Sequence, residues 1–159
     1  MNLALMALLI AGAATVADPQ ADQPSLKSSN RLILAGVQYG APMRTSASVA
    51  LFMSRSLNKT YPRIEGWLVE AGAGQGGGRI SVGHAGFLEY LGLDLRGVLS
   101  RTWNSPRAAT PKATYGGLEA GMTILYVRVS AGVARRLAGP AGDHATIFTW
   151  SGAIQIPIK

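Results

Sequence analysis

The sequence predicts an all-β fold, in which about eight strands form a single up-and-down antiparallel β-barrel. Three observations predict it. Apolar and polar residues alternate along long segments, Gly-rich and Pro-rich links separate those segments, and no segment reaches the roughly 18 consecutive apolar residues of a spanning helix. Yet the chain is apolar: 48% of its 159 residues are hydrophobic, 14% are charged, and its mean hydropathy is +0.19. This length fits one domain.

The alternation is clearest between Thr114 and Arg136, which we interpret as two strands joined at Leu125-Tyr126. A two-residue turn there pairs Ile124 with Val127, so the apolar faces of both strands coincide. The apolar face then carries Leu118, Ala120, Met122 and Ile124 from the first strand and Val127, Val129, Ala131 and Val133 from the second. The opposite face is small and polar. Such a hairpin can place its apolar face either on a protein core or in lipid.

The chain begins with an apolar stretch, Leu3–Val16, which has the length of a signal-peptide core and is followed by Ala17. Residues 1–17 are therefore predicted to be a signal peptide, although a buried helix is the alternative and the missing Lys or Arg before Leu3 leaves room for a start further upstream. The polar residues 18–30 are predicted to be a flexible lead-in. Residues 31–159 then form the barrel domain. The chain contains no Cys, so cysteine content gives no information about its cellular compartment.

Eight segments of the barrel domain have strand character, and most are near the length of about 9–11 residues that a tilted membrane strand needs. They are Arg31–Tyr39, Thr45–Ser54, Arg63–Ala73, Arg79–Leu88, Leu93–Trp103, Thr114–Ile124, Val127–Arg136 and Ala145–Ile158. In an up-and-down barrel, alternate links lie at the same rim. Two links of one set, 104–113 and 137–144, are long and contain Pro and Gly, whereas two links of the other set are tight. The sequence thus predicts a rim of loops and a rim of short turns.

Both rims carry aromatic residues, which are enriched where an apolar band meets water. We expect two girdles, formed by Tyr61, Tyr90 and Tyr126 at the turns and by Tyr39, Trp103 and Tyr115 at the opposite strand ends. The formal net charge of +7 favours an anionic neighbour. No basic run or aromatic-basic motif indicates nucleic acid. We therefore expect Arg44, Arg107 and Lys112 on the loop side to contact anionic lipid headgroups.

If the apolar faces point outward, charged side chains fill the interior. The predicted interior cluster consists of Glu70, Asp94, Arg96, Glu119 and Arg128. Glu119, Arg96 and Arg128 lie on the same side of three consecutive strands, so we expect them to be within reach of one another. Such charges must pair, because an isolated buried ion is very costly. An eight-stranded barrel is just wide enough for side chains to fill, which predicts a plugged interior.

The last strand, Ala145–Ile158, alternates apolar residues up to its end. It resembles the C-terminal strand of bacterial outer-membrane β-barrels, apart from Pro157 and a final Lys159 where an aromatic residue is usual. Over residues 31–158 the chain is similar to small eight-stranded outer-membrane barrels. The resemblance implies a transmembrane, porin-like fold in the bacterial outer membrane, with lipid as the neighbour and a monomer as the expected state.

Other sites have weaker signals. The Gly-rich segment Gly72–Gly78 opens no helix and lacks a following Lys-Ser or Lys-Thr, so a hairpin link is expected instead of a phosphate loop. His84 and His144 have no partners at metal-ligand spacing, and no metal or other cofactor is expected. A lipid-modifying enzyme using His84 is a minor alternative. The favoured function is non-enzymatic, in envelope structure or adhesion, and the alternative is a secreted lipocalin-like barrel with an apolar ligand.

Overall fold

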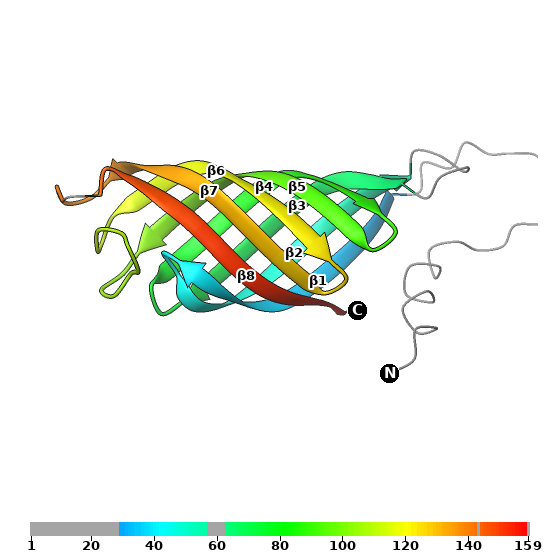
Figure 1. Ribbon diagram of the computed structural model, residues 1–159, viewed down its shortest axis with the longest axis horizontal. Helices are drawn as coiled ribbons and strands as arrows, with labels where there is room; N and C mark the ends of the chain where they lie inside the picture. Colours follow the sequence, from blue (N-terminus) through cyan, green and yellow to red (C-terminus); the bar gives the residue numbers. More distant parts are fainter. Residues whose placement is uncertain (1–28, 57–62, 143, 159) are drawn as a thin grey trace, which may run out of the picture.

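The computed structural model describes residues 29–56, 63–142 and 144–158, which form a closed barrel (Figure 1). Its strands are β1 (Ser29–Ala41), β2 (Arg44–Ser56), β3 (Arg63–Gly74), β4 (Gly77–Leu88), β5 (Leu91–Thr102), β6 (Thr114–Ile124), β7 (Val127–Ala138) and β8 (Thr146–Ile158). Each strand pairs antiparallel with the next, and β8 pairs with β1 to close the sheet. The prediction of one all-β, up-and-down barrel of eight strands is confirmed.

The predicted strand boundaries lie within two residues of the observed ones. In the central hairpin, Ile124 pairs with Val127 and Thr123 with Arg128, as the alternation predicts. The predicted signal peptide and nearly all of the lead-in lie outside the described residues. Within the part that is described, no helix has the length and apolarity needed to cross a membrane.

The links divide into two sets at opposite ends of the barrel (Figure 1). We call one end the loop rim; it carries the short turns 42–43 and 75–76 and the longer links 103–113 and 139–145. The other end, the turn rim, carries Glu89-Tyr90 and Leu125-Tyr126 together with the end of β8. The Gly-rich segment is therefore a tight hairpin, because β3 ends at Gly74 and β4 begins at Gly77.

Burial alternates along the strands, with apolar side chains outside and polar ones inside. On β5, for example, exposed Leu93 and Leu95 alternate with buried Asp94 and Arg96. Among the described residues, 29 large hydrophobic side chains are exposed, whereas only 12 hydrophobic residues are buried. This polarity is the reverse of that of a water-soluble globular domain, which exposes contiguous apolar patches of only a few hundred Å².

Candidate functional site: the barrel interior and its rims

A chain of ion pairs crosses the middle of the interior. Arg96 donates hydrogen bonds to Glu70 at 2.6 Å and to Asp94 at 2.7 Å. Arg128 donates to Asp94 at 2.8 Å and to Glu119 at 3.3 Å. All five of these residues are buried, and the most exposed of them, Asp94, is 9% exposed. The structure thus places all five residues of the predicted interior cluster in one network.

The predicted cluster omits Arg79 of β4, which extends the network. Its guanidinium donates to Glu119 Oε1 at 3.1 Å, and the residue is 8% exposed. The strand contains a signal for this position: Arg79 lies five positions before His84, so the two side chains face opposite sides of the sheet. Because His84 lies on the outward face together with Ile80 and Val82, the alternation places Arg79 inside. At the other end of the network, Gln155 donates to Glu70 Oε2 at 3.1 Å.

The network is electrically balanced, with equal numbers of arginines and acidic residues. Three arginines, Arg79, Arg96 and Arg128, face three acidic residues, Glu70, Asp94 and Glu119. Each charge therefore has an opposite charge in contact, which offsets the large desolvation cost of burial. An interior void lined by Arg79 and Glu119 has a volume of about 10 Å³, the space of about one water molecule. This arrangement can cross-link the barrel wall, because its ion pairs join residues of several strands.

Apolar side chains lie on both sides of the charged layer. Toward the turn rim, Phe52 packs edge-to-face on Phe87, with ring centroids 5.3 Å apart. Buried Ala50, Leu68 and Ala85 complete this cluster, and partly buried Leu34 and Ile64 pack against it. Toward the loop rim, a second cluster consists of Ala109, Ala113, Tyr115, Ala134 and Ile147. The interior is thus layered, with paired charges held between two apolar zones.

The link 103–113 forms part of the loop rim's own packing. Thr102 Oγ1 donates to the carbonyl of Thr110 at 2.7 Å and accepts from the amide of Ala113 at 2.9 Å. The amide of Trp103 donates to Gly76 of the β3–β4 turn at 2.9 Å. The amide of Arg107 donates to Pro42 of the β1–β2 turn at 3.1 Å. These bonds hold the link against two other turns, so it bridges the mouth of the barrel.

Tyr115 does not belong to the predicted aromatic girdle. Its residue is 0% exposed, and its hydroxyl accepts from the Thr110 amide at 2.9 Å and donates to the His144 carbonyl at 3.1 Å. The physical reason is the period of two: Tyr115 shares the inward face with Glu119. Its ring instead supports the link that covers the loop rim.

The other described girdle residues lie at the two rims. Tyr39 and Trp103 are about half exposed at the loop rim, and Tyr90 is half exposed at the turn rim, where Tyr126 is partly exposed. Tyr61 lies outside the described residues. Trp150, which the prediction omitted, packs edge-to-face on Tyr39 with ring centroids 5.9 Å apart. Aromatic rings therefore lie near both ends of the apolar wall.

Basic residues gather at the loop rim. The predicted headgroup contacts Arg44, Arg107 and Lys112 are all exposed there. Arg107 also places its guanidinium over the rings of Tyr39 and Trp150, at 5.7 and 5.6 Å, and donates to the Tyr39 hydroxyl. The same rim carries three more cations: Arg101, Arg135 and Arg136. Among the described residues no acidic side chain lies at this rim, because Glu65 and Glu89 are near the turn rim and the others are inside.

Both histidines are exposed and lie outside the interior network. His84 is exposed on the outer wall, between Trp67 and Leu95 of the neighbouring strands, and its ring packs edge-to-face on Trp67 at 5.9 Å. His144 contributes its backbone carbonyl to Tyr115. In the described part of the chain, no group of three or more His, Cys, Asp or Glu side chains could hold a metal ion.

Comparison of the chain with models of known protein families, with curated proteins and with solved structures gave no match in any of the three cases.

Proposed function

We propose that this protein is a non-enzymatic β-barrel of the bacterial outer membrane, exported by its N-terminal signal peptide and acting in envelope structure or adhesion. The observation that carries the proposal is the polarity of the barrel wall. Large apolar side chains cover the outside, and three ion-paired arginines lie inside. This arrangement matches a barrel whose outer solvent is hydrocarbon.

The dimensions support the same proposal. Strands of 11 to 13 residues at about 3.3 Å per residue and a tilt of about 40° give a wall about 30 Å high. The outward apolar band of a membrane barrel is about 25 Å high and is bordered by aromatic girdles. Tyr39, Trp103 and Tyr90 have the exposure and the rim positions of such girdle residues. The barrel is thus tall enough to span a bilayer as a monomer.

The layered interior supports a structural role over solute transport. The ion-paired layer lies between two apolar clusters, and the void beside Arg79 and Glu119 holds about 10 Å³. In planar bilayers, the inserted protein should therefore give no steady ion conductance. The wall and rims would instead interact with lipid and with surface partners.

Heat modifiability tests the proposal. The mature chain is refolded into phospholipid vesicles and run in SDS gels with and without boiling. A folded membrane barrel should migrate differently before and after boiling and should resist protease in vesicles. A chain that is folded and soluble without detergent would contradict the proposal and would favour a secreted ligand-binding barrel. An activity on lipid that is lost on His84→Ala would contradict the non-enzymatic assignment.

A further inference from the structure

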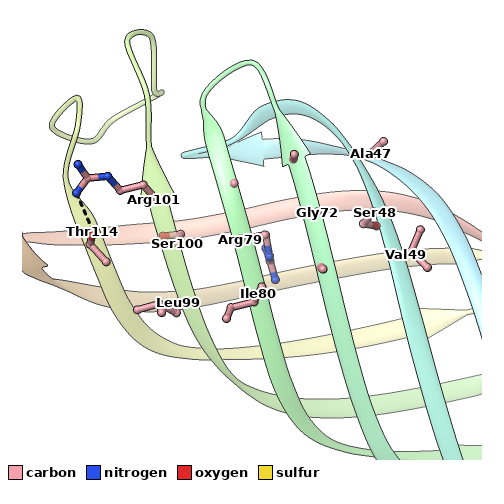
Figure 2. A pocket seen from close by; sticks show the side chains of 13 residues that line it. Ala47, Ser48, Val49, Gly72, Arg79, Ile80, Leu99, Ser100, Arg101 and Thr114 are labelled. Carbon is pink, nitrogen blue, oxygen red and sulfur yellow. Dashed lines mark hydrogen bonds between the residues drawn. The ribbon is translucent and has the colours of Figure 1, made fainter.

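The outer wall has an apolar depression just below the loop rim, with a volume of about 690 Å³ (Figure 2). One row of paired residues runs through it across five strands: Ala47, Ala73, Gly78, Arg101 and Thr114. The first three of these have little or no side chain, so the wall is thin there. The depression is thus a floor of small residues that leads to one cation.

Larger side chains bound this floor. The next row toward the middle of the barrel contains Val49, Ile80 and Leu99, all exposed on the outer face. On the rim side, a Cβ built on Gly78 would be 3.9 Å from the indole of Trp103 and would meet no atom closer than 3.7 Å. The floor is therefore open to the outside, with aliphatic groups below it and an aromatic ring above it.

The charge at the end of the depression is accessible. Arg101 is exposed, and its Nη1 donates to Thr114 Oγ1 at 2.9 Å (Figure 2). No acidic side chain among the described residues lies at this rim, which also carries Arg135 and Lys112. Arginine binds phosphate oxygens through a planar fork of N–H donors. The remaining N–H groups of Arg101 are thus suited to a phosphate at the edge of the apolar floor.

We propose that this depression is a binding site for an anionic phospholipid, with an acyl chain on the Ala47–Ala73–Gly78 floor and the headgroup phosphate on Arg101. The inference rests on the proposed membrane function, because the lipid reaches the site from the surrounding leaflet. Apolar contact alone would accept any lipid. The cationic rim adds a preference for lipids with net negative charge, since each basic side chain near an anionic surface contributes separately.

Quenching of Trp103 by brominated lipids tests the proposal. A variant carrying Trp67→Phe and Trp150→Phe retains Trp103 as its single tryptophan and is reconstituted in phosphatidylcholine vesicles. Brominated phosphatidylglycerol should quench Trp103 more than brominated phosphatidylcholine does at the same mole fraction. Arg101→Gln should lower this preference about fivefold. Arg31→Gln, near the turn rim, is the matched control and should not change it.

A second pair of variants tests the floor. Ala73→Leu fills the depression with an outward side chain and should reduce quenching by both lipids, whereas Ala120→Leu, at an exposed outward position on β6, should not. Equal quenching of the inserted protein by both lipids would overturn the site while leaving the membrane proposal intact. Failure to insert would overturn both. A crosslinked dimer lost on Ala73→Leu would show that a second copy of the chain, not lipid, covers the depression.

Discussion

Glu119 accepts hydrogen bonds from two guanidinium groups, those of Arg79 and Arg128, at 3.1 and 3.3 Å. The residue is 2% exposed, so its carboxylate is largely shielded from bulk water. Removing one member of such a buried group leaves charge uncompensated and typically costs about 3–5 kcal/mol. Removing an acidic residue and its arginine partner together destabilises the fold less, because no unpaired charge remains buried. The stability of the interior therefore depends on balance more than on any one pair.

Glu119→Gln should accordingly lower the free energy of unfolding by about 3–5 kcal/mol. Combined with Arg79→Met, it should cost less than the sum of the single changes, because the two residues share an ion pair. Urea unfolding in detergent micelles measures all three variants. Glu89→Gln, in the exposed β4–β5 turn, is the control and should change stability by less than about 0.5 kcal/mol. Additive effects of Glu119→Gln and Arg79→Met would contradict the observed pairing.

Tyr115→Phe should destabilise the barrel through its hydroxyl alone. The change leaves the buried amide of Thr110 without an acceptor, which costs about 1–3 kcal/mol. Tyr90→Phe removes a hydroxyl from a half-exposed side chain at the turn rim and should have a much smaller effect. The comparison uses the same unfolding measurement. Equal effects would mean that Tyr115 is not buried beneath the link.

At the residue scale, the sequence predicts which face of the sheet a side chain occupies better than it predicts which residue that side chain pairs with. Alternation identifies Arg96 and Glu119 as inward residues, and they lie opposite each other in the register. Yet the observed ion pairs join Arg96 to Asp94 and Glu70 instead. A long arginine side chain in a narrow lumen can reach carboxylates of several strands. The period of two fixes the face of each residue, but the choice among those carboxylates depends on three-dimensional packing.

At the scale of elements, the link 103–113 has packing that its amino-acid composition does not predict. Its Pro, Arg and Lys residues indicate a surface loop, and the sequence correctly predicts a connection there. However, Ala109 and Ala113 within it are buried against Tyr115. This packing depends on contacts with two other turns, at Pro42 and Gly76, that are distant in sequence. Local patterns carry no information about such contacts.

Arg107→Ala should loosen this link. The guanidinium lies over the rings of Tyr39 and Trp150, and an exposed cation–π contact contributes about 0.5–1 kcal/mol. The variant should fold, show faster proteolysis within the link and change the fluorescence of Trp150 in a variant where it is the single tryptophan. Lys112→Ala, which removes an exposed cation from the same link, is the control. Unchanged proteolysis in Arg107→Ala would show that the backbone bonds alone hold the link.

At the scale of the whole molecule, strand number and order follow from the sequence because two local signals agree. The period of two marks the strands, and tight turns join consecutive ones. Side-chain burial near the ends of the barrel is harder to predict from the sequence. Leu34 packs against the interior cluster, but Leu32, on the same face of β1, is 43% exposed. Alternation assigns a side to a residue, whereas burial near a rim depends on how far the tilted strands extend past one another.

Whether lipid or water surrounds the outer wall can be tested by introducing one charge at two positions along the same strand, one near its middle and one at its end. Leu118 lies near the middle of β6, opposite Gly97 and Val133, and Ile124 is the last residue of that strand. Both are well exposed, at 64% and 50%. In a bilayer, Leu118→Arg should lower the free energy of unfolding by about 2–4 kcal/mol and Ile124→Arg by about 0–1 kcal/mol.

Urea titration of the protein folded in phospholipid vesicles measures this difference. The difference arises because only the bilayer makes the cost of a charge depend on depth, as water solvates an arginine equally well at both positions. Leu118→Gln provides a polar, uncharged control at the same height and should fall between the wild type and Leu118→Arg. If Leu118→Arg and Ile124→Arg both change stability by less than about 0.5 kcal/mol, as exposed positions in water do, the outer wall does not contact lipid.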